Sequence, residues 1–133
     1  MKDKLNFYIN GQWVESDSNE RIEIINPANE ELIGHVTSGT KEDINKAVLA
    51  ASDAFQTYQF SSKEDRIEIL KNIITEYENR YDDLVQVITE EMGAPTWLSQ
   101  KAQASTGIKN LHETLDALKD YEFEKKEGDY TLI

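Results

Sequence analysis

The chain has 133 residues, with 14 Lys and Arg against 26 Asp and Glu, and a formal net charge of -12. This length fits one domain, and 38% hydrophobic with 30% charged residues is typical of a globular protein, not of a disordered acidic tail. The negative charge argues against binding nucleic acid through its phosphates and against an anionic membrane surface. The sequence has no cysteine, which excludes disulfides, thiolate metal sites and a cysteine nucleophile, and makes a cytoplasmic protein the expectation.

The first part of the chain has the patterns of short strands. Asn10-Gly11 separates two runs of aromatic and branched residues, 7–9 and 12–14. Because Asn-Gly supplies the two positive φ values of a type I′ turn, these runs are predicted to pair as an antiparallel hairpin. Trp13, in the second run, is expected in the core or in helix packing, since no basic groove accompanies it.

A second antiparallel pair is predicted from the apolar runs 22–25 and 32–36. Pro27 fixes its own φ and favours extended geometry at Asn26, so residues 26–31 between the runs should form a defined turn. Four short strands cannot close a core by themselves. One face of these strands is therefore expected to pack on helices or on something outside this chain.

Helical periodicity fills most of the sequence after these strands. Thr40 with Asp43 is a variant of the capping box that starts a helix, and Ser61 or Ser62 repeats this signal before a second apolar stripe. The second stripe ends at Gly93, the candidate C-cap, which is followed closely by a proline that cannot continue the helix. A bend near residues 79–81 is expected, because the pattern is longer than most globular helices.

A third helix is predicted from about Thr96 to Lys119. Gly107 lies in its middle, and a small residue there indicates that another backbone packs closely against it. The tail returns to alternating strand-like residues at 121–124 and 130–133. Because the sequence stops inside this second apolar run, the chain is expected to be cut from a longer product.

No group of residues indicates a catalytic or metal site by itself. His35 and His112 are the only histidines, and there is no cysteine to complete a zinc site with them. The acidic pairs at 82–83 and 90–91 fit a solvated helix face better than an acid/base pair, because adjacent helical residues point about 100° apart. The glycines form neither a dinucleotide fingerprint nor a phosphate loop. From this chemistry alone the chain is a scaffold.

Several short segments follow one another in a set order along nearly the whole chain. They are Phe7-Tyr8-Ile9-Asn10-Gly11-Gln12-Trp13, Ile25-Asn26-Pro27-Ala28 with Glu31-Leu32-Ile33, Lys41-Glu42-Asp43-Ile44-Asn45-Lys46-Ala47-Val48 leading to Ala50-Ala51 and Ala54-Phe55, Arg66 with Ile69-Leu70, and Glu91-Met92-Gly93-Ala94-Pro95. Each segment alone is a weak signal. Their order and spacing together resemble the N-terminal part of the aldehyde dehydrogenase superfamily.

The resemblance implies an NAD(P)-dependent enzyme that oxidises an aldehyde to a carboxylic acid through a cysteine thiolate. The family's cysteine, its general-base glutamate and its cofactor-phosphate motifs lie beyond this sequence. No catalytic or cofactor-binding residue is therefore assigned, and this chain alone is expected to be inactive and to hold no cofactor. The complete enzyme is expected to use NAD or NADP and a small-molecule aldehyde, and to be a homo-oligomer that binds neither nucleic acid nor membrane; this chain's partner is the remainder of the enzyme.

The resemblance also implies an α/β fold, which in this piece is α+β, with antiparallel hairpins, three main helices and then strands of an oligomerisation arm. Residues 1–120 would form the N-terminal part of the Rossmann-like cofactor-binding domain. Residues 121–133 would begin the arm that joins subunits.

One ligand site of the family reaches into this region. Many members hold a monovalent cation with backbone carbonyls just before the Asn-Pro turn and a carboxylate at the end of the second helical stretch. The matching positions are Ile24, Ile25 and Glu91. Some members have the shorter Asp at the last position, so a surface charge at a helix end is the alternative role of Glu91.

A second interpretation stays open, in which the chain is a free-standing acidic helical module that binds a partner protein. The reading frame after Ile133 distinguishes the two. An enzyme predicts another strand, a Pro-Trp-Asn type segment and, much later, a lone reactive cysteine, whereas a stop codon favours the module.

Overall fold

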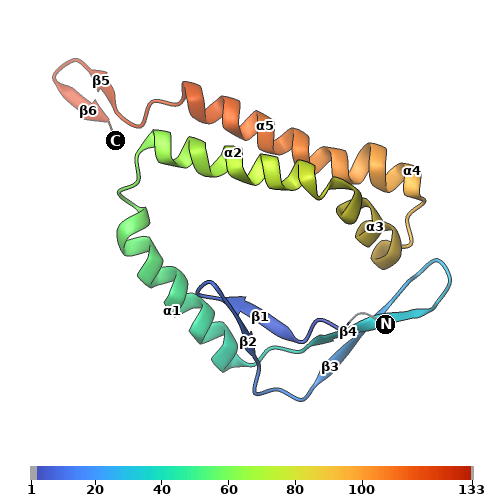
Figure 1. The fold of residues 1–133 in the computed structure, drawn as a ribbon. Helices are drawn as coiled ribbons and strands as arrows, with labels where there is room; N and C mark the ends of the chain where they lie inside the picture. The colour runs from blue at the N-terminus through green and yellow to red at the C-terminus, as the bar shows by residue number, and fades with distance from the viewer. Residues whose placement is uncertain (1–2, 133) are drawn as a thin grey trace.

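The structure is a computed structural model that describes residues 3–132. It mixes strands and helices as an α+β arrangement (Figure 1). In chain order the elements are β1 (Asn6–Ile9), β2 (Gln12–Glu15), β3 (Arg21–Ile25), β4 (Leu32–Thr37), α1 (Lys41–Tyr58), α2 (Lys63–Asn79), α3 (Tyr81–Met92), α4 (Thr96–Leu98), the π-helix η1 (Ser99–Ala104), α5 (Ser105–Asp120), β5 (Lys125–Glu127) and β6 (Tyr130–Leu132). None of the helices in the described range combines the length and hydrophobicity that a membrane span requires.

The strands form three separate antiparallel pairs, β1–β2, β3–β4 and β5–β6. Asn10 and Gly11 have φ values of 52° and 77°, which confirms the left-handed turn predicted for the first hairpin. The strand predicted at 121–124 is wrong, because these residues form a linker in which Tyr121 and Phe123 stack edge to face at 4.9 Å. Ile133, the end of the other predicted tail strand, lies outside the described residues.

Both predicted helix starts are confirmed as reciprocal capping boxes. Thr40 accepts from the Asp43 amide while the Asp43 carboxylate accepts from the Thr40 amide, and Ser62 makes the same exchange at the start of α2. The predicted bend is a break at Arg80, which ends α2 and precedes α3. Gly93 ends α3 in the left-handed region with a φ of 65°, as a C-cap glycine does.

The third helix differs from its prediction in two respects. After the short helix α4 it widens into the π-helix η1, and two tyrosine hydroxyls from the neighbouring helices donate hydrogen bonds to carbonyls of this segment. Tyr77 donates to the Ala104 carbonyl at 2.8 Å, and Tyr81 donates to the Gln100 carbonyl. The neighbour of Gly107 is the Tyr77 side chain and not a backbone, because a Cβ at Gly107 would overlap the Tyr77 hydroxyl.

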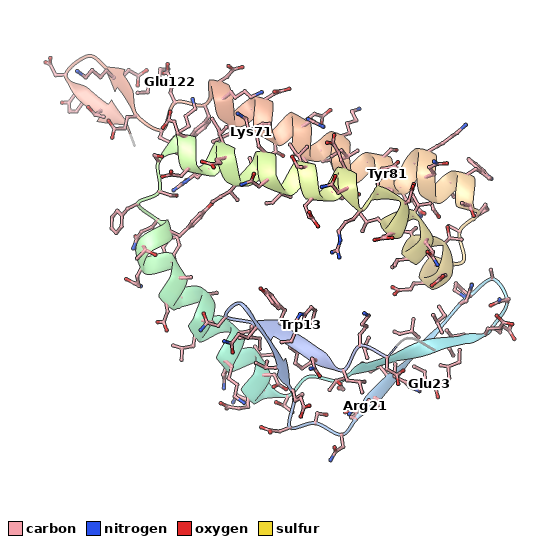
Figure 2. All side chains as sticks on the ribbon, viewed as in Figure 1. Trp13, Arg21, Glu23, Lys71, Tyr81 and Glu122 are labelled. Carbon is pink, nitrogen blue, oxygen red and sulfur yellow. The ribbon has the colours of Figure 1, made fainter. Side chains whose placement is uncertain are left out.

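The buried apolar core is small and lies in the helical half. Among the described residues the buried apolar side chains are Ile74, Val85, Ala104 and Leu115, from α2, α3, η1 and α5. The remaining half, made of α1 and the first two hairpins, curves away from this core as the other side of an arch (Figure 1). Trp13, expected in the core or in helix packing, is 69% exposed and extends toward the inside of the arch (Figure 2).

Candidate functional site

The residues matched to a cation site lie at a junction between the strand half and the helical half. Ile24 and Ile25 are the last two residues of β3, and Glu91 is the second-last residue of α3. A Cβ added at Gly93 would lie 2.8 Å from the Ala28 nitrogen, so the end of α3 touches the turn that follows β3. The structure thus brings the end of α3, beside Glu91, against a turn that is far away in sequence.

This turn is held by its own polar groups. The Asn26 amide donates to the Glu31 carbonyl at 2.9 Å, and the Glu30 amide donates to the Asn26 carbonyl at 2.8 Å. The Asn26 side chain accepts from the Ala28 amide at 2.9 Å, which is an Asx turn. The pairing with β4 shifts register between Ile24 and Ile25. The defined turn predicted around Pro27 is therefore confirmed, and it presents a fixed backbone to the end of α3.

The groups matched to the cation site by the resemblance are all oxygens. Backbone carbonyls and a carboxylate suit a hard cation. Within residues 3–132, this junction included, there is no group of three or more His, Asp or Glu side chains placed to hold a metal ion. Glycine at position 93 matters here, because a side chain would occupy the space in which Pro27 and Ala28 approach α3. The sequence identified Gly93 only as a helix end and gave no signal for this long-range contact.

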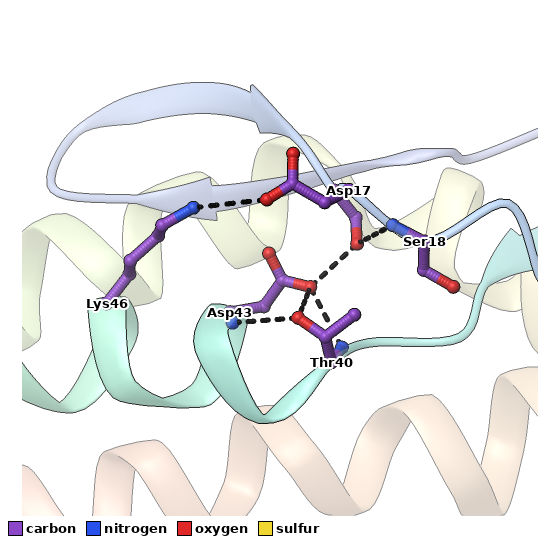
Figure 3. A network of polar contacts seen from close by, with 6 residues as sticks. Asp17, Ser18, Thr40, Asp43 and Lys46 are labelled. Atoms are coloured by element: carbon purple, nitrogen blue, oxygen red, sulfur yellow. Dashed lines mark hydrogen bonds and ion pairs between the residues drawn. The ribbon is translucent and has the colours of Figure 1, made fainter.

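A second polar cluster joins the β2–β3 loop to α1 (Figure 3). Asp43 is only 5% exposed, and one of its oxygens accepts from the Ser16 hydroxyl at 2.6 Å, from the Thr40 hydroxyl at 2.8 Å and from the Thr40 amide at 2.9 Å. The Ser16 hydroxyl, followed by the Thr40 groups, holds the pKa of Asp43 below its usual value. Beside it Lys46 pairs with Asp17 at 3.8 Å. A carboxylate bound in this way connects the β2–β3 loop to the start of α1 and does not act as a general base.

The two histidines each pair with one carboxylate. The Asp3 carboxylate accepts from the His35 amide at 3.0 Å and lies 3.0 Å from His35 Nδ1, and the ring contact is the main cause that lowers the pKa of Asp3. His112 Nε2 lies 3.7 Å from a Glu78 oxygen. Neither histidine joins a metal cluster among the described residues.

The sequence model of the aldehyde dehydrogenase family matches residues 13–132. The chain belongs to the aldehyde dehydrogenase family. A putative aldehyde dehydrogenase of Staphylococcus aureus strain USA300 is 50% identical over all 133 residues, which make up 28% of that protein. The chain therefore spans about 28% of the length of the curated relatives that it matches.

Solved aldehyde dehydrogenases have the same backbone arrangement. The enzyme from Bartonella henselae superimposes with a TM-score of 0.93 at 34% identity, over 97% of this chain and 28% of that one. A mutant of aldehyde dehydrogenase C from Pseudomonas syringae, complexed with NAD+ and octanal, superimposes with a TM-score of 0.89 at 34% identity, over 92% of this chain and 25% of that one. The arch of this aldehyde dehydrogenase chain is thus a shape found within whole enzymes.

Proposed function

We propose that this chain forms the N-terminal scaffold of an NAD(P)-dependent aldehyde dehydrogenase. The enzyme would oxidise an aldehyde to a carboxylic acid, with water supplying the second oxygen and NAD(P)+ accepting the hydride. The observation that carries this proposal is the superposition on a whole enzyme over 97% of the chain. The NAD+ and octanal in the complex of the Pseudomonas syringae enzyme support the cofactor and the substrate class.

The chain itself would supply structure and no chemistry. It contains no cysteine, so the thiolate that attacks the aldehyde must come from another part of the enzyme. Residues 1–120 would belong to the cofactor-binding domain, and 121–133 would begin the arm that joins subunits in a homo-oligomer. The projection of the β5–β6 hairpin beyond the ends of α2 and α5 supports this division (Figure 1).

A chimera tests the proposal. In it, residues 1–133 replace the matched 133 residues of the Staphylococcus aureus relative. We expect the chimera to reduce NAD+ or NADP+ with the aldehydes that the unmodified relative oxidises, while the 133-residue chain alone forms no NADH. A chimera that assembles like the relative and oxidises none of these aldehydes would contradict the proposal. Aldehyde-dependent NADH formation by the isolated chain would contradict the scaffold role.

The cation site is a separate part of the proposal. The carbonyls of Ile24 and Ile25 and the carboxylate of Glu91 would bind a sodium or potassium ion, and the contact of Gly93 with the β3–β4 turn supports it. A crystal of the chimera soaked in a potassium salt should show an anomalous peak beside Glu91, which is lost in Glu91→Gln. Crystals with no peak there would count against the site.

The alternative of a free-standing interaction module is not favoured by the match to whole enzymes. The exposed apolar side chains lead to an expectation for the chain alone. Because Ile44 and Val48 on α1 are each 62% exposed, we expect the isolated chain to self-associate. Analytical ultracentrifugation tests this, and a cooperatively melting monomer would contradict it.

A further inference from the structure

Two basic side chains of α2 meet the linker that leads to the last hairpin. Lys63 donates to the carbonyls of Lys119 and Tyr121, with the second bond at 3.0 Å. These carbonyls lie at the C-terminal end of α5, where a positive charge is favoured by the helix dipole. The first turn of α2 is thereby fastened to the end of α5.

Arg66, one turn further along α2, makes a second set of contacts with this linker. Its guanidinium lies 5.5 Å from the ring centre of Tyr58 and 5.2 Å from that of Phe123, so it is in cation–π range of both rings. Its Nε donates to the Ser61 hydroxyl at 2.9 Å, and its Nη2 donates to the Gln59 carbonyl at 3.3 Å. One guanidinium thus connects the end of α1, the α1–α2 loop and the linker.

The β5–β6 hairpin depends on these contacts of Lys63 and Arg66 for a fixed orientation. Each of its strands has three residues, and a two-stranded hairpin of this size is marginally stable in water. Tyr130 is 77% exposed, and β5 is exposed along its whole length. The direction of the hairpin is therefore set by the linker at 121–124 and by what the linker contacts.

We propose that Lys63 and Arg66 form a latch that fixes the direction in which the β5–β6 hairpin leaves the α2–α5 pair. Tyr121 and Phe123, stacked on each other, are the part of the linker that the latch holds. Under the proposed function, on which this step rests, the hairpin begins the arm that joins subunits, so the latch sets how this arm leaves the helices. Neither residue takes part in chemistry, so both are positioning residues.

Because the chain has no cysteine, spin labels can be attached at two introduced cysteines alone, and the distance between them can be measured. Spin labels on Asn110→Cys in α5 and Lys126→Cys in β5 report the direction of the hairpin by pulsed electron spin resonance. Both positions are exposed. Dilution with unlabelled chain removes distances between molecules. We expect a single narrow distance distribution, which broadens in the Lys63→Met and Arg66→Met variants.

Arg80→Met is the matched control, because Arg80 is an exposed basic residue at the other end of α2, where it pairs with Glu76 at 3.4 Å. Its distribution should equal that of the parent. A broad distribution in the parent, or an unchanged one in the Lys63→Met, Arg66→Met double variant, would overturn the proposal.

A second label pair guards against general unfolding. Labels on Asn72→Cys in α2 and Asn110→Cys in α5 report the helical pair alone, and this distance should stay the same in the latch variants. If this distance changes, the Phe123→Leu variant distinguishes loss of the latch from general unfolding, because it removes the ring and leaves both basic residues in place. Broadening by Phe123→Leu supports the latch, and its absence overturns it. The measurement needs no catalysis, so an inactive chimera would leave this result unaffected.

Discussion

Replacing Gly93 with alanine tests the contact between the end of α3 and the β3–β4 turn. The φ of Gly93 is 65°, and a residue with a Cβ in this region costs about 1–2 kcal/mol. The new Cβ would lie 2.8 Å from the Ala28 nitrogen and 3.0 Å from the Pro27 Cγ, and overpacking of this kind costs roughly 1–3 kcal/mol. Together these give a decrease in the free energy of unfolding of roughly 2–5 kcal/mol.

Gly11→Ala is the control that separates the two effects. Gly11 also has a positive φ, 77°, but a Cβ there would have nothing within 4 Å beyond its chain neighbours. Gly11→Ala should therefore lower the free energy of unfolding only by the cost of the backbone conformation, about 1–2 kcal/mol. Both variants are compared by urea unfolding followed by far-UV circular dichroism, at several protein concentrations and with the slope m checked for equality. If Gly93→Ala lowers stability no more than Gly11→Ala, the packing of α3 on the turn is refuted.

Three further predictions concern the polar contacts. Tyr77→Phe leaves the Ala104 carbonyl without its tyrosine donor and should cost about 1 kcal/mol in the same urea assay. Gly107→Ala should be destabilising in the parent despite its better helix propensity, because it displaces the Tyr77 hydroxyl, and less so in the Tyr77→Phe background; additive effects would contradict this. Ser16→Ala should raise the pKa of Asp43 toward its ordinary value, as read by NMR titration. A lowered carboxyl pKa stabilises the fold above the unfolded value of about 3.9. The decrease in the free energy of unfolding caused by Ser16→Ala should therefore be complete at neutral pH and disappear as the pH falls through the folded-state pKa.

Local signals account for the parts of the fold that could be predicted from the sequence. The turn at Asn10-Gly11 and the capping boxes at Thr40 and Ser62 each depend on residues at most three positions apart. Such signals act before any tertiary contact forms, so they can be found without knowledge of the fold. The helix end at Gly93 is another local signal of this kind. The contact of Gly93 with the β3–β4 turn is not local and could not be predicted in this way.

The features that escaped prediction depend on residues far apart in sequence. The π-helix η1 has carbonyls bound by Tyr77 and Tyr81, which come from other helices. The linker at 121–124 alternates like a strand, but Phe123 lies over Arg66, a contact that spans most of the helical half. Periodicity reports which face a residue occupies and says nothing about its partner. The same limit applies to the candidate cation site, whose positions came from a family resemblance and not from spacing.

The described residues are held together by joints more than by a core. The few buried apolar side chains all lie in the helical half, whereas three polar or close-packed contacts fix the angles between elements. These joints are Asp43 with Ser16 at the start of α1, Gly93 with the β3–β4 turn, and Arg66 with the linker before β5. Because each joint restrains a direction without burying much apolar surface, it can preserve the shape of the arch while its apolar faces stay open. For the scaffold role proposed above, such open faces are what the rest of the enzyme would pack against, and a core that closed on itself would leave none.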